Sequence, residues 1–201
     1  MIFDLIAIAV VGSLLLFAAS IALQFSGKFP RRTIQDVTPF LRTAEAHEFQ
    51  SLLDPAQEVN FRLRLSPSAF ASWQRKRLLL AREYLLRMSH NSLVLIEWGN
   101  METIGQEACE SEIFRQKKLL AQELVHAATE FRLYSMLALF KLRLWLLLPS
   151  RLFLLRAPSL PRLRNLFGIN AIAAYERLKG AAGSLGIIYS NDVQQDLLAR
   201  L

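Results

Sequence analysis

The chain has 201 residues, 53% of them hydrophobic, and a mean hydropathy of +0.26. This composition is too apolar for an intrinsically disordered chain, and a single cysteine, Cys109, excludes a disulfide-stapled fold. The 24 basic and 17 acidic residues give a net charge of +7 and a pI near 10.0. Such a charge favours one of two partner classes, nucleic acid or an anionic membrane surface.

The first apolar run covers residues 5–23 and carries no charge. At about 1.5 Å per residue, a helix of this length approaches the roughly 30 Å thickness of a hydrocarbon core. Basic residues follow directly: Lys28, Arg31 and Arg32. Because basic residues stay on the cytoplasmic side, we predict a single-pass transmembrane anchor over 1–27, with the N-terminus outside and 28–201 in the cytoplasm. A cleaved signal peptide is the alternative, and the acidic Asp4 disfavours it.

The rest of the chain has the pattern of an all-α protein. Three pairs of residues combine a helix N-cap with proline at the first helical position: Thr38-Pro39, Asp54-Pro55 and Ser66-Pro67. We therefore predict short helices and a linker over 28–66. Apolar residues at steps of three and four then predict one long helix from Pro67 and another from near Glu107 to Leu148.

These two helices, over 67–148, are expected to pack as a long antiparallel hairpin. The first of them is apolar over most of its circumference, which predicts burial on more than one side and favours a homo-oligomer or a protein partner. Residues 149–201 read as a Pro/Arg-rich linker and short C-terminal helices. There, Gly180, Gly183 and Gly186 are expected to interrupt a weak helix over 170–179, and Ser190 or Asn191 to cap the last one. No strand alternation stands out.

A second apolar run covers residues 133–155, and its charge pattern suggests an interface. Residues 131–165 hold seven basic and no acidic residues. Basic residues among leucines and aromatics are typical of a segment that lies on a membrane surface. The predicted membrane-surface residues are Lys141, Arg143, Trp145, Arg151, Arg156, Arg162 and Arg164. Two alternatives stay open, a core helix and a second span, although Lys141 and Arg143 disfavour the span. These two cations also lie about 200° apart around a helix, which argues against a single polar face.

One pattern permits a metal site. Glu123 and His126 form a Glu-x-x-His pair on one helix face, as in di-iron bundles, and a hairpin loop centred near residue 103 would place Glu83 level with Glu123. Such sites need a second Glu-x-x-His, which the sequence lacks. The alternative function is therefore a membrane-bound metal-carboxylate enzyme that uses Glu83, Glu123 and His126.

The favoured interpretation is a membrane-anchored helical interaction or scaffold protein with no identifiable catalytic site and no cofactor. Its expected partners are the lipid bilayer, a second copy or another protein. Nucleic acid is disfavoured, because the basic residues are mixed with bulky aliphatics and do not form a polar face.

Overall fold

The computed structural model describes residues 33–104, 112–148, 153 and 157–201. The chain divides into two units, Met1–Pro30 and Arg31–Leu201. The predicted anchor over 1–27 lies outside the described residues. Within the described residues, no helix combines the length and the apolar character needed to cross a membrane.

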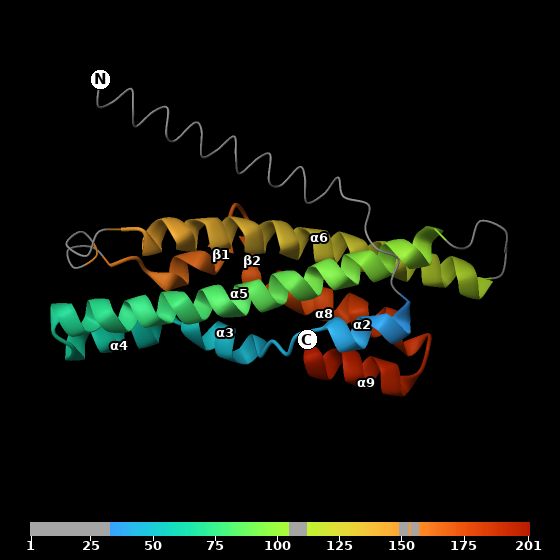
Figure 1. Ribbon diagram of the computed structural model, residues 1–201, viewed down its shortest axis with the longest axis horizontal. Helices are drawn as coiled ribbons and strands as arrows, with labels where there is room; N and C mark the ends of the chain where they lie inside the picture. The colour runs from blue at the N-terminus through green and yellow to red at the C-terminus, as the bar shows by residue number, and fades with distance from the viewer. Residues whose placement is uncertain (1–32, 105–111, 149–152, 154–156) are drawn as a thin grey trace, which may run out of the picture. The chain divides into compact units, whose positions relative to one another are not determined.

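Two long helices form the centre of the second unit. Helix α5 (Pro67–Ile104) and helix α6 (Glu112–Leu146) lie side by side along their length and run antiparallel (Figure 1). The start of α5 is the predicted one, since the hydroxyl of Ser66 accepts a hydrogen bond from the backbone N–H of Ala69 at 3.3 Å. The predicted all-α hairpin is therefore confirmed.

Gly99 sets the register of the hairpin. A Cβ at this position would lie 2.6 Å from Cγ2 of Val125 and 3.2 Å from the backbone oxygen of Ala121. Only glycine allows the two helices to approach this closely. At the other end of the hairpin, the guanidinium of Arg75 lies 3.5 Å from the carbonyl oxygen of Leu146.

Between residue 33 and the hairpin, the structure describes three short helices: α2 (Ile34–Phe40), α3 (Ala46–Leu52) and α4 (Pro55–Arg64). Asp54 caps α4 as predicted, because its carboxylate accepts from the backbone N–H of Ala56 at 2.9 Å. The predicted start at Thr38-Pro39 is wrong. Helix α2 instead begins after Thr33, which forms a capping box with Asp36, and Pro39 lies in the last turn. The Asp36 carboxylate accepts from both the hydroxyl and the backbone N–H of Thr33, at 2.8 and 3.4 Å, so the helix starts four residues before Thr38.

The segment between α2 and α3 is fixed to α5 by Asn91. Its buried side-chain amide accepts from the backbone N–H of Arg42 at 2.8 Å and donates to the carbonyl of Arg42 at 2.7 Å. Helices α2 and α3 both pack on α5, so they cover its second apolar side around Asn91. Farther toward the start of α5, Leu79 and Leu80 remain exposed.

A tight turn follows the linker and was not predicted. After a 3-10 turn, η1 (Leu160–Leu163), strands β1 (Asn165–Leu166) and β2 (Ile169–Asn170) pair as a short antiparallel hairpin. The two residues between them, Phe167 and Gly168, both have positive φ, 52° and 82°. This is the backbone of a type I′ turn. Four strand residues are too few to produce a detectable alternation.

The predicted interruption by glycines is also wrong. Helix α8 (Ala171–Ile187) runs without a break through all three glycines and leads to α9 (Asn191–Arg200), capped by Ser190. A Cβ on Gly186 would lie 3.0 Å from Leu197, and one on Gly183 would lie 3.5 Å from Leu198. Gly186 therefore serves the close packing of α8 against α9, whereas nothing lies within 4 Å of a Cβ on Gly180.

The core extends from the contact between α5 and α6 to the place where α8 packs against α6. Its largest side chains include Phe131, Tyr134 and Tyr175, with the Phe131 ring 4.9 Å from the Tyr175 ring. Each buried tyrosine hydroxyl has a partner: Tyr134 donates to the carbonyl of Leu163 and Tyr175 to that of Leu201, both at 2.6 Å. Burial raises the pKa of both hydroxyls. The side of α6 that carries Phe131 and Tyr134 is therefore buried in the core and is not available to a partner.

Candidate functional site

The register of the hairpin separates the three residues of the metal alternative. Gly99 lies level with Ala121 and Val125, so Glu83, sixteen residues earlier, lies about 24 Å farther along α5 than the layer of Glu123. Glu83 is exposed and pairs with Arg87 at 2.6 Å. Glu123 and His126 are exposed on α6. Throughout the described residues, no group of three His, Cys, Asp or Glu lies close enough together to hold a metal ion.

A matched charge cluster lies where α5 ends and α6 begins. The carboxylate of Glu102 accepts from the indole N–H of Trp98 at 3.0 Å and from the hydroxyl of Tyr189, and it lies 2.7 Å from Nζ of Lys117. Burial opposes the charge on Lys117, but its bonds to Glu102 and Tyr189 outweigh this and raise its pKa. We call these four residues the closed-end cluster. The two charges of this cluster, on Glu102 and Lys117, form an ion pair with each other, so the role of the cluster is structural.

A second buried network holds the linker against α4 and α5. The amide of Gln74 donates to Glu58 at 3.0 Å and to the carbonyl of Pro158 at 2.7 Å, and the backbone N–H of Leu160 donates to Glu58 at 3.2 Å. Arg77 pairs with Glu58 at 3.9 Å and lies 4.5 Å over the ring of Trp73. Burial lowers the pKa of Arg77, and the nearby Glu58 and Asp54 limit the shift. The network fixes residues 158–160 in space.

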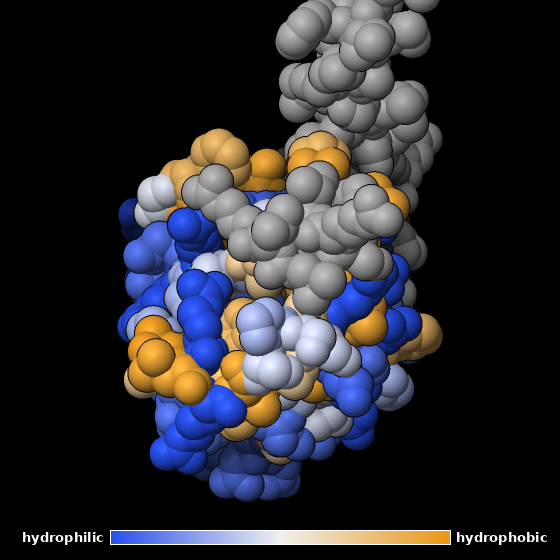
Figure 2. All heavy atoms as spheres, turned by 90° about the vertical axis from the view of Figure 1, so that its left-hand side faces the viewer, coloured by the Kyte–Doolittle hydropathy of each residue, from blue (hydrophilic) through white to orange (hydrophobic). Residues whose placement is uncertain are grey.

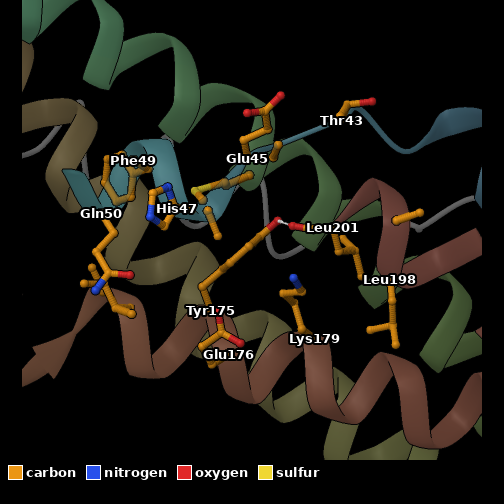
Figure 3. Close-up of a pocket in the computed structure, with 16 residues that line it drawn as sticks. Thr43, Glu45, His47, Phe49, Gln50, Tyr175, Glu176, Lys179, Leu198 and Leu201 are labelled. Carbon is orange, nitrogen blue, oxygen red and sulfur yellow. Dashed lines mark hydrogen bonds between the residues drawn. The ribbon is translucent and has the colours of Figure 1, made fainter. Parts of the chain in front are cut away.

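A cavity of about 400 Å³ opens between α3, α8 and the end of α9 (Figure 3). Figure 3 shows Tyr175 reaching across it to Leu201, with Glu45, His47 and Lys179 on different parts of the wall. No hydrogen bond or ion pair links these three ionisable side chains in the described part of the chain. They form no acid–base pair, so the cavity carries no catalytic argument.

The outer face of α6 presents an apolar ridge. Its members follow one another at steps of four, three, four and three residues, which keeps them within about 40° on either side of the ridge centre, a sector of about 80°. Leu133, Leu144 and Leu147 are 38%, 50% and 79% exposed. The sector lies opposite the side that buries Ala138 and Leu142. We name the following residues the outer ridge: Leu133, Leu137, Phe140, Leu144 and Leu147.

Two cations flank the outer ridge. At 100° per residue, Lys141 lies about 80° to one side of the ridge centre and Arg143 about 80° to the other. Their 200° separation therefore does not disrupt the apolar face, because it places one cation along each border. Arg143 is exposed, and Nζ of Lys141 lies 5.2 Å over the ring of Trp145. Burial and the charge of Arg162 lower the pKa of Lys141.

A hollow of about 750 Å³ lies beside Lys141, between α4, the end of α6 and residues 157–162. Trp145, Arg162 and Ser159 line it, and so does Arg62 from α4. Exposed Val59 of α4 also lines it. In Figure 2, which faces this end of the hairpin, hydrophobic and hydrophilic surfaces alternate. Sequence reasoning missed the contribution of α4, although its mixture of Arg and Leu resembles that of residues 133–164.

The predicted surface residues thus have different positions. Trp145 and Arg162 line the hollow and Lys141 lies over the ring of Trp145, whereas Arg143 borders the outer ridge on its other side. Arg164 is exposed next to β1. Arg151 and Arg156 lie outside the described residues.

Comparison with protein families, with curated proteins and with solved structures gave no match to this chain.

Proposed function

We propose that this is a non-catalytic, helical interaction protein that lies against the surface of an anionic membrane through the outer ridge. In this proposal, the predicted span over 5–23 tethers the chain, and the unit Arg31–Leu201 is its cytoplasmic part. The single observation that carries the proposal is the apolar ridge of α6 with a cation along each border.

This arrangement suits an amphipathic helix at an interface. Apolar side chains enter the acyl boundary while the stems of Lys141 and Arg143 extend along it and keep their charges among the headgroups. Fully burying a leucine side chain is worth about 2 kcal/mol, and each cation near an anionic leaflet about 1 kcal/mol. Leu144 and Leu147 have enough exposed surface to contribute at this scale.

The charges favour a membrane over a second copy of the chain. Residues 131–165 contain no acidic side chain, so pairing two outer ridges would bring cations against cations along both borders. Like charges at such positions oppose self-association. An anionic leaflet supplies the opposite charge on both borders at once.

The test uses the full chain reconstituted in vesicles, with a nitroxide on Leu147→Cys in a Cys109→Ser background. Oxygen concentrates in the acyl region, whereas a nickel chelate stays in water. We expect the label at position 147 to collide more with oxygen in vesicles that contain phosphatidylglycerol, and more with nickel in pure phosphatidylcholine. A label on Ala173→Cys, at an exposed site of α8, should collide with nickel in both.

Two results would contradict the proposal. One is a label at position 147 that remains in water in anionic vesicles. The other is dipolar broadening between labels at position 147 without a gain in oxygen collisions, which would identify a second copy as the occupant of the ridge.

A further inference from the structure

The hollow beside the outer ridge has an excess of positive charge at fixed positions. Arg162 lies on its wall, and Lys141 is close enough to Arg162 for that charge to lower the pKa of Lys141. Within residues 33–104, 112–148 and 157–201, no carboxylate lies within ion-pair distance of either cation. Placing two like charges close together costs free energy, which a bound anion would recover.

The one acid at the hollow is already engaged. Glu58 accepts hydrogen bonds from Gln74 and from the backbone of Leu160, and it is shared by two arginines, Arg77 at 3.9 Å and Arg62 at 4.0 Å. Arg62 extends from this ion pair over the ring of Phe70, at 5.1 Å, along the wall of the hollow. Glu58 therefore orients Arg62 and leaves the charges of Arg162 and Lys141 unmatched.

The site is held in shape by the elements around it. The Glu58–Gln74 network ties residues 158–160 to α4 and α5, and Arg162 follows them within η1. Nζ of Lys141 lies over the ring of Trp145, within the usual distance of a cation–π contact. Two cations, Arg62 and Arg162, thus line the hollow together with the hydroxyl of Ser159, and Lys141 lies beside it over the ring of Trp145.

We propose that this hollow binds one phosphate group, held by Arg162, Lys141 and Arg62. Arginine suits a phosphate because its planar guanidinium donates two parallel hydrogen bonds, and lysine adds a point charge. The inference deepens the proposed function and rests on it for the source of the ligand, the phosphate of an acidic lipid headgroup. A free phosphate ester offers the same chemistry, so the experiment separates the two sources.

The experiment uses the full chain in an uncharged detergent, where native mass spectrometry counts bound lipids. We expect one retained dioleoyl phosphatidic acid and no retained dioleoyl phosphatidylcholine. Arg162→Gln and Lys141→Gln should each weaken retention about fivefold, the factor that corresponds to one cation near an anionic headgroup. Lys141→Arg should restore it. Arg115→Gln and Lys118→Gln, which remove exposed cations elsewhere on α6, are the matched controls and should change nothing.

A second titration measures glycerol 3-phosphate and inorganic phosphate by calorimetry in the same detergent. Binding of these probes that Arg162→Gln weakens, without retention of phosphatidic acid, supports the site and identifies a free phosphate ester as its ligand. The proposal is overturned if none of the phosphate probes binds, or if Arg162→Gln binds them as well as the unaltered chain does.

Failure of the phosphate site can be distinguished from failure of the proposed function. Leu144→Asn with Leu147→Asn removes the exposed apolar part of the outer ridge and leaves the hollow's cations in place. This double variant should retain phosphatidic acid in detergent, although we expect it to lose contact with the acyl region in vesicles.

Discussion

Lys117 and Lys141 belong to the same helix, and each places its ammonium group over an aromatic ring, yet their surroundings differ. Lys117 lies 4.5 Å over Tyr189 and 2.7 Å from the carboxylate of Glu102. Lys141 lies 5.2 Å over Trp145 and faces the charge of Arg162. The aromatic support is common to both, so the carboxylate makes the difference. A lysine with an internal counter-ion stabilises the fold, whereas one beside another cation is available to an external anion.

The largest effect is expected from removing the counter-ion of the closed-end cluster. Glu102→Ala leaves Lys117 and two hydrogen-bond donors without their acceptor in a mostly buried site. We expect the free energy of unfolding to fall by about 3 kcal/mol. Thermal unfolding followed by circular dichroism measures this, with Glu123→Ala, an exposed glutamate of α6, as the control. A loss as small as that of the control would show that the cluster does not stabilise the fold.

Replacing each lysine in turn tests the comparison directly. Lys117→Gln removes a charged partner of Glu102 and should lower the free energy of unfolding by about 1.5 kcal/mol. Lys141→Gln removes a cation that Arg162 repels, so we expect a change within about 0.5 kcal/mol, in either direction. The same unfolding measurement gives both values. Equal losses in the two variants would mean that Lys117 does not stabilise the fold more than Lys141 does.

The close approach of α5 and α6 at Gly99 should also affect the free energy of unfolding. Gly99→Ala inserts a Cβ 2.6 Å from Val125, and we expect a net loss of about 1 kcal/mol after the better helix propensity of alanine is counted. Gly180→Ala is the matched control, because nothing lies within 4 Å of its Cβ. It should stabilise the chain by up to about 1 kcal/mol. The same sign for both variants would contradict the close contact.

The smallest effect concerns alkaline pH. The pKa of Lys141 is lowered in the folded chain, so the unfolded chain binds more protons between that value and about 10.4, and stability rises with pH in this window. The pKa of Lys117 is raised, so its contribution is complete below about 10.4 and is lost as pH rises through the folded value. Below about pH 10.4, the free energy of unfolding of Lys141→Gln should therefore lack the rise with pH that Lys141 contributes to the unaltered chain. Above about pH 10.4, that of Lys117→Gln should fall less steeply than that of the unaltered chain. Parallel pH curves for the two variants would refute this.

Local signals in the sequence predicted several features of the fold. Asp54-Pro55, Ser66-Pro67 and Ser190 mark helix starts because each side-chain oxygen satisfies a nearby backbone donor, which needs no distant partner. The steps of three and four residues likewise predicted the two long helices of the hairpin. The concentration of basic residues over 131–165 was also visible, because composition does not depend on folding.

Features that depend on contacts between distant segments could not be predicted. The hairpin register follows from Gly99 packing on Val125 and not from the midpoint of a loop, which is why Glu83 and Glu123 do not share a layer. Gly183 and Gly186 lie inside α8 at the face that contacts Leu197 and Leu198 of α9. The pattern of Lys141 and Arg143 suggested two opposite faces, whereas the burial of Ala138 and Leu142 defines an outer ridge with one cation along each border.

The sequence by itself thus determined an all-α chain with a long helical hairpin and a basic, apolar segment near its end, because helix periodicity, capping and charge are properties of neighbouring residues. Only the tertiary structure decided which lysine has a counter-ion. Glu102 reaches Lys117 from the other helix of the hairpin, and Arg162 reaches Lys141 from beyond the linker. Electrostatic energy depends on distance in space, and the fold sets that distance.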